Sequence, residues 1–132
     1  MIDHLSTYTT NFVATKAFYS AVLAELDFSV QAEIELDADS DLPGRRACAF
    51  GPNGRPVFWV VEALEAYTPR HVAFTARNRD CVVAFHAAGV LVGGRDFGAP
   101  GLRPIYHENY YGAFLTDPDG NNVEAVCHAP PP

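Results

Sequence analysis

Three residues of this chain belong to the types that hold divalent metal ions, namely His4, His71 and Glu124. Glu124 is the least expected of them, because it lies in an apolar run between Val123 and Ala125. A carboxylate in a half-buried strand is costly unless it is paired or holds a metal. Two imidazoles and one carboxylate are a recurring ligand set for divalent transition metals with open coordination positions, notably non-haem Fe(II).

The elements that would position these residues occur twice along the chain. Alternating and β-branched residues predict strands, and apolar residues at helical spacing predict helices. The first set comprises a strand at 2–9, a helix at 12–26 with Asn11 as its N-cap, and strands at 27–36, 46–50 and 56–61. The second comprises a strand at 71–76, a helix at 80–89, a strand near 95–98, and a hairpin of 110–116 with 122–127.

Matching landmarks support a true internal repeat. His4 and His71 are 67 residues apart, and so are Phe18 and Phe85. Ala49-Phe50 and Ala113-Phe114 each precede a proline turn. Because internal similarity of this kind decides the fold, we expect an α+β fold of two βαβββ modules in one domain, 1–128. Module one spans about 1–64 and module two about 69–128, and residues 129–132 form a flexible tail.

The repeat places the three candidate ligands at related positions. His4 and His71 each open the first strand of a module, and Glu124 lies in the last strand of module two, four residues after Gly120. If the sheets of the two modules face each other, these strands bring all three side chains to one point. The alternatives are an edge-strand glutamate that faces solvent and two ordinary hydrogen-bonded histidines.

Four stretches of the chain form a further pattern: His4 in the first strand, Phe18-Tyr19 in the first helix, His71-Val72-Ala73-Phe74, and the turn and strand from Asp117 to Glu124. With these stretches the chain resembles the vicinal oxygen chelate superfamily, which includes glyoxalase I, extradiol dioxygenases and bleomycin resistance proteins. The resemblance covers about residues 1–127. It implies a cup-shaped mixed sheet built from paired βαβββ modules, usually with a metal in the cup and often as a homodimer.

The resemblance also implies a ligand set. His4, His71 and Glu124 match three of the superfamily's four metal positions. The fourth position falls on Phe58 or Trp59, neither of which can ligate, and Glu62 lies four residues too far along. This departure from glyoxalase I leaves the three-ligand pattern of the extradiol dioxygenases and fosfomycin-modifying enzymes. The implied cofactor is one divalent ion, Fe²⁺, Mn²⁺, Ni²⁺ or Zn²⁺, that chelates two oxygens of a substrate.

The segment before the hairpin carries further polar groups. We expect His107 to transfer protons, since histidine changes charge near neutral pH. Tyr110 and Tyr111 could donate hydrogen bonds to an oxyanion, although tyrosines that merely cover the end of the sheet are an equal alternative. His86 and His128 are expected to be non-functional.

Four residues are candidates for substrate binding. Trp59 and Phe58 could line the cup with a flat apolar surface, with a core position for Trp59 as the alternative. Arg46 and Arg103 could hold an anionic group.

Composition excludes several classes of partner. Nine Lys and Arg stand against 16 Asp and Glu, a formal net charge of −7, which argues against nucleic-acid and membrane-surface binding. No apolar run approaches the roughly 18 residues of a membrane-spanning helix. The absence of a signal-peptide pattern and the three dispersed cysteines favour a cytoplasmic protein with reduced thiols.

The sequence thus predicts a small divalent-metal-dependent enzyme acting on a small-molecule substrate. Lyase or isomerase, ring-cleaving dioxygenase and thiol-transferase chemistry stay open. The alternative is a metal-free protein that binds and sequesters a small molecule, as the antibiotic-binding members of the superfamily do.

Overall fold

The computed structural model describes residues 1–132, and its elements follow one order twice. Module one contains β1 (Leu5–Thr9), α1 (Phe12–Ala24), β2 (Ser29–Glu35), β3 (Arg46–Gly51) and β4 (Phe58–Glu62). Module two contains β5 (His71–Thr75), α2 (Arg79–Leu91), β6 (Arg95–Leu102), β7 (Tyr111–Thr116) and β8 (Asn122–Cys127). The predicted α+β fold of two βαβββ modules is therefore confirmed.

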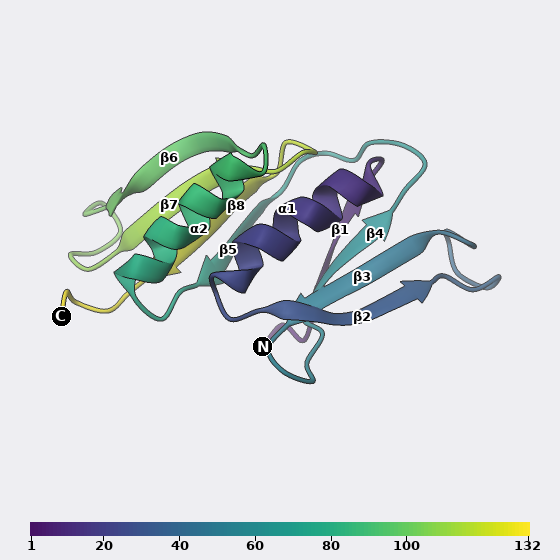
Figure 1. Cartoon of the computed structure of the whole chain (residues 1–132), viewed down its shortest axis with the longest axis horizontal. Coiled ribbons are helices and arrows are strands. Elements are labelled where there is room, and N and C mark those ends of the chain that lie inside the picture. Colours follow the sequence, from purple (N-terminus) through teal and green to yellow (C-terminus); the bar gives the residue numbers. More distant parts are fainter.

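Each module forms a four-stranded mixed sheet. The strand orders are β1-β4-β3-β2 and β5-β8-β7-β6, with the first strand of each module parallel to its last and the other pairs antiparallel. In Figure 1 the two sheets lie next to each other, both helices cover the same side, and β1 and β5 run in opposite directions. The sheets of one chain therefore do not face each other.

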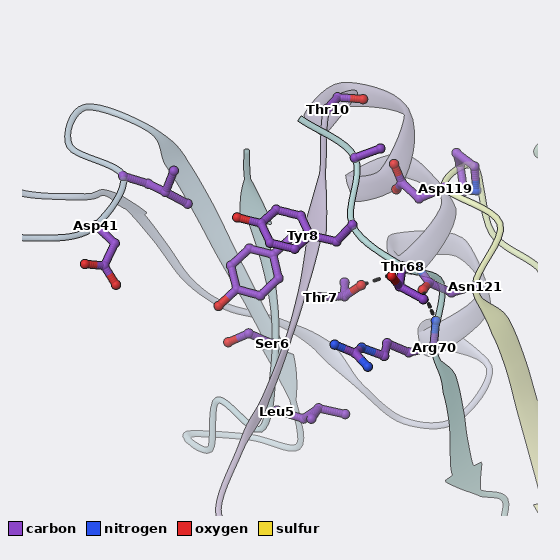
Figure 2. A pocket seen from close by; sticks show the side chains of 14 residues that line it. Leu5, Ser6, Thr7, Tyr8, Thr10, Asp41, Thr68, Arg70, Asp119 and Asn121 are labelled. Atoms are coloured by element: carbon purple, nitrogen blue, oxygen red, sulfur yellow. Dashed lines mark hydrogen bonds between the residues drawn. The ribbon is translucent and has the colours of Figure 1, made fainter. Parts of the chain in front are cut away.

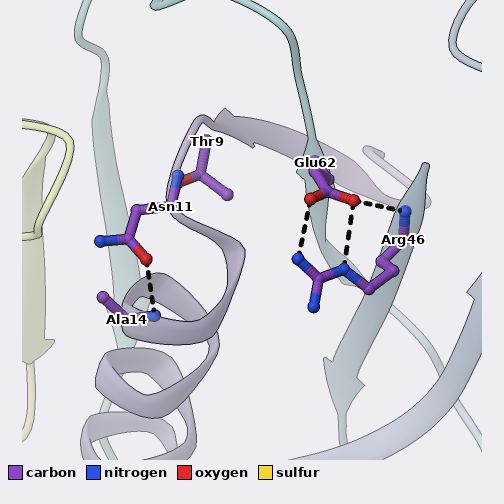
Figure 3. A network of polar contacts seen from close by, with 5 residues as sticks. All are labelled: Thr9, Asn11, Ala14, Arg46 and Glu62. Atoms are coloured by element: carbon purple, nitrogen blue, oxygen red, sulfur yellow. Dashed lines mark hydrogen bonds and ion pairs between the residues drawn. The ribbon is translucent and has the colours of Figure 1, made fainter.

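Both helices begin at an asparagine cap and bury one face. The Asn11 carboxamide oxygen accepts a hydrogen bond from the Ala14 N–H at 3.2 Å (Figure 3), and Asn78 caps α2 in the same way through Cys81 at 2.9 Å. Phe18 of α1 and Phe85 of α2 are both fully buried in one core shared by the two modules. Neither helix is long and apolar enough to cross a membrane.

The predicted turn at 117–120 also joins the modules. Asp119 accepts hydrogen bonds from the hydroxyls of Thr9 at 2.9 Å and Thr15 at 2.7 Å. Asp117 accepts one from the Tyr19 hydroxyl at 2.5 Å. Burial and the Asp117 carboxylate raise the pKa of Tyr19 well above its ordinary value. The sequence predicted a turn here, but not that its two carboxylates hold module one.

Alternation along the strands separates two faces of each sheet. Residues such as Phe58 and Val123 point toward the helices and the core, so their neighbours point the other way. We call this second side the open face. In module one it carries Ser6, Tyr8 and Trp59, and in module two His71, Phe114 and Glu124.

Candidate functional site

The open face of module two holds a buried carboxylate with two polar partners. Glu124 is 2% exposed. Its Oε2 lies 2.9 Å from Nε2 of His71, and its Oε1 accepts a hydrogen bond from the Tyr110 hydroxyl. No lysine or arginine pairs with it. Two of the three predicted ligands are therefore in contact, across the parallel pair β5–β8.

Two neighbours, Phe114 and Gly112, shape this cluster. Phe114 is the cross-strand partner of Glu124, and its ring packs edge-on against His71 at 6.2 Å between centroids. A Cβ atom at Gly112 would lie 3.2 Å from Glu124 Oε1 and 3.3 Å from the Tyr110 ring. Glycine at position 112 thus leaves room for the contact between Tyr110 and Glu124.

Tyr110 is held as a hydrogen-bond donor. Burial raises its pKa well above the ordinary value, and the hydrogen bond to Glu124 raises it further. The phenol therefore stays protonated at neutral pH and orients the carboxylate. It is the only one of the three predicted catalytic residues that touches Glu124.

His107 and His128 form a pair beside Tyr110. Nε2 of His107 lies 2.8 Å from Nδ1 of His128, and both rings lie edge-on to the Tyr110 ring, at 5.5 and 5.3 Å between centroids. His128 was expected to have no role. His128 lies one residue after the end of β8, and His107 lies shortly before the start of β7. Because β7 and β8 are antiparallel, these two ends are adjacent, and this pairing could have predicted the contact between the two histidines.

His4 lies apart from this cluster. Its ring contacts Asp3 at 2.6 Å and its side chain is 56% exposed. Within one chain no group of three His, Cys, Asp or Glu side chains is close enough to hold a metal ion. The expected meeting of His4, His71 and Glu124 required module sheets that face each other, and in this chain they lie side by side.

Strand pairing identifies the module-one counterpart of Glu124. Leu5, which follows His4, pairs with Phe58, whereas Val72, which follows His71, pairs with Val123. Glu124 therefore corresponds to Trp59, and Phe58 corresponds to a core residue. Of the two residues predicted for this position, Phe58 and Trp59, strand pairing selects Trp59, since a shift of one residue exchanges the faces of a strand.

Two predicted site residues point toward the helices instead. Phe58 is 2% exposed and packs between Tyr19 and Phe74, at 4.8 and 5.2 Å between ring centroids, so it has no surface to offer a substrate. Tyr111 follows Tyr110 and takes the opposite face, where Arg79 lies 5.0 Å from its ring centroid. Neither residue reaches Glu124.

The two predicted anion-binding arginines differ. Arg46 donates to Glu62 through Nη2 at 2.8 Å and Nε at 3.1 Å (Figure 3), and it lies over the Phe12 ring on the helix side. Its charge is already matched. Arg103 lies over Phe114, 5.5 Å from the ring centroid, and is therefore near the cluster.

A pocket of about 790 Å³ lies where β1 meets the segment before β5 (Figure 2). Ser6 and Tyr8 of β1, Tyr67 and Arg70 of the connecting segment, and Asn121 are among the residues that line it. His71 and Glu124 do not line it. Residues 62–70 carry no local sequence pattern that predicts this pocket.

Paired βαβββ modules of this kind are found in solved glyoxalase/bleomycin resistance/dioxygenase proteins, so the chain has the vicinal oxygen chelate fold. A glyoxalase/bleomycin resistance protein from Albidiferax ferrireducens aligns with a TM-score of 0.71 and 24% identity, covering 96% of this chain and 97% of that one. A glyoxalase I variant from Zea mays aligns with a TM-score of 0.69 and 17% identity, covering 95% of this chain and 46% of that one. No family model and no curated protein matches the sequence.

Proposed function

We propose that this protein is a small divalent-metal-dependent enzyme whose site is centred on His71 and Glu124. The contact between a half-exposed imidazole and a nearly buried carboxylate carries the proposal. A buried carboxylate with no lysine or arginine beside it is costly, and a metal cation removes that cost. Imidazole nitrogen and carboxylate oxygen are donors that suit Fe²⁺, Mn²⁺, Ni²⁺ or Zn²⁺.

His4 is the proposed third donor, supplied by module one of a second copy in a homodimer. His4 precedes β1 by one residue, in alternation with Ser6 and Tyr8 on the open face. The open faces of both modules lie on the side away from the helices, so a second copy related by a two-fold axis could cover them. Module one of that copy would then present His4 and Trp59 to His71 and Glu124.

Each neighbouring residue has a specific part in this proposal. The metal would act as a Lewis acid on two oxygens of a small substrate. The Tyr110 hydroxyl holds Glu124 Oε1, which leaves Oε2 directed at His71. Trp59 and Phe114 give flat apolar walls that exclude water, and Arg103 beside Phe114 attracts an anionic group. The exposed His107–His128 pair can exchange protons with solvent.

Metal content tests the proposal. Protein purified without a polyhistidine tag and incubated with each of the four ions should retain metal after desalting, and Glu124→Ala should lose it. Glu62→Ala is the matched control, because it removes a carboxylate that Arg46 already pairs. Wild-type protein that stays empty with every ion, or equal retention by Glu124→Ala, would contradict a metal site.

A metal-free binding protein of the antibiotic-sequestering type is the second candidate. Trp59 at the position that corresponds to Glu124 favours it, because an indole adds binding surface and no ligand. Titration with bleomycin, followed by Trp59 fluorescence in EDTA, would test this function. Binding that survives both EDTA and Glu124→Ala would favour it, and no binding would reject it for this ligand.

A further inference from the structure

The pocket beside β1 contains a guanidinium without a protein partner. The Arg70 side chain makes no ion pair or hydrogen bond, although its backbone is fixed. Its N–H donates to the Asn121 side-chain oxygen at 2.7 Å, and its carbonyl accepts from the Asn122 N–H at 2.8 Å. Figure 2 shows the side chain directed into the pocket. A side chain with a fixed backbone and five free N–H donors is suited to binding a carboxylate.

An aromatic pair forms another wall of this pocket. The ring centroids of Tyr8 and Tyr67 lie 4.8 Å apart, and the ring planes are tilted by 31°. Tyr8 is 39% exposed and Tyr67 is 51% exposed. Both rings line the same pocket as Arg70, and Figure 2 shows the Tyr8 ring there. Exposed aromatic faces of this kind bind flat rings better than aliphatic groups.

The acidic residues of the pocket limit the charge of its ligand. Both oxygens of Asp119 already accept hydrogen bonds, from Thr9 and Thr15. Asp41 lines the far side and is exposed. One arginine with two carboxylates nearby, in a chain of net charge −7, matches a monoanion better than a doubly charged phosphate.

We propose that the Arg70 pocket, which His71 and Glu124 of the same chain do not line, is a binding site for a planar aromatic monocarboxylate. Arg70 takes the carboxylate in a two-pronged contact, and the ring lies against Tyr8 and Tyr67. The Ser6 hydroxyl, which has no partner in the protein, is a further donor on the same wall.

Benzoate is the probe, titrated into metal-free protein in EDTA and followed by amide NMR shifts. Saturable shifts should gather at residues 6–8, 66–70 and 121. Arg70→Gln should weaken binding about tenfold or more, the range of one charge-assisted contact. Tyr67→Ala should weaken it about threefold. Arg55→Gln is the matched control, since it removes one exposed arginine in the β3–β4 turn outside the pocket, and it should leave binding unchanged.

Three related probes test the ligand class. Cyclohexanecarboxylate, which lacks a flat ring, and benzamide, which lacks charge, should both bind more weakly than benzoate. Inorganic phosphate that binds as tightly as benzoate would overturn the aromatic part of the proposal. Equal binding by Arg70→Gln, or no saturable shift in the pocket, would overturn the site itself. Because EDTA is present throughout, the result does not depend on the metal proposal, and Arg70→Gln should retain metal as wild type does.

Discussion

Trp59 and Glu124 occupy the same position in two modules built on one plan. Each lies in the last strand of its module. Trp59 pairs with Ser6, two residues after His4, and Glu124 pairs with Ala73, two residues after His71. Module one places an indole there and module two a carboxylate. The scaffold therefore repeats, but the charge does not, and the proposed metal site takes its only carboxylate from module two.

The modules also handle their carboxylates differently. In module one Glu62 lies on the helix side and pairs with Arg46 through two side-chain hydrogen bonds. In module two Glu124 lies on the open face and has only His71 and Tyr110. An arginine-paired carboxylate is satisfied within the chain, whereas a buried carboxylate beside a histidine can accept a further cation.

Equivalent core residues of the two modules should contribute equally to stability. Phe18→Ala and Phe85→Ala each remove a fully buried ring at equivalent helix positions. Each should lower the free energy of unfolding by about 3–5 kcal/mol, measured by urea denaturation. If one variant loses less than about 1 kcal/mol and the other loses about 3–5 kcal/mol, the two phenylalanines do not have equivalent roles in the core.

The turns, in contrast, should differ. Asp117→Ala leaves the buried Tyr19 hydroxyl without an acceptor and removes partners of Asn121. It should cost about 2–3 kcal/mol. Asn53→Ala in the turn of module one removes an exposed side chain without a hydrogen bond, and should stay within about 0.5 kcal/mol. Equal effects in urea denaturation would show that the turn of module two does not hold the modules together.

Glu124 should behave as a functional residue rather than a stabilising one. In EDTA, Glu124→Gln keeps a side-chain oxygen for Tyr110 and removes a buried charge, so the unfolding free energy should stay equal or rise by up to about 1 kcal/mol. Thermal unfolding measures this change. A loss above about 2 kcal/mol would make the carboxylate a structural counterpart of Glu62.

The ion pair of module one should give a small acid-dependent effect. Hydrogen bonds from Arg46 lower the Glu62 pKa from 4.5 to about 2. Because the folded-state pKa is the lower one, the stabilisation is present above pH 4.5 and is lost as pH falls toward 2. At pH 7 the free energy of unfolding of the wild type should exceed that of Glu62→Gln by about 0.5–1 kcal/mol, the range measured for exposed ion pairs. A difference that persists at pH 2 would contradict this origin.

The sequence predicted the elements better than the directions of their side chains. Alternation, helical spacing and the Asn11 cap located every strand and both helices, because these signals are local. The 67-residue spacing of His4 and His71 related the two modules. Phe58 was predicted together with Trp59, and Tyr111 together with Tyr110, but neighbouring residues of a strand take opposite faces, so Phe58 and Tyr111 point toward the helices. The pairing of Arg46 with Glu62, and the pocket around Arg70, depend on contacts between distant segments that no local pattern encodes.

Metal bound per chain in mixed variants tests the central claim, that module two supplies two ligands and module one of a second copy the third. His4→Ala and Glu124→Ala should each be empty alone. Unfolded together and refolded, they should regain about one quarter of the wild-type metal, because half of randomly formed dimers are mixed and each mixed dimer has one intact site of two. A mixture that stays empty, or metal retained by His4→Ala alone, would contradict the claim.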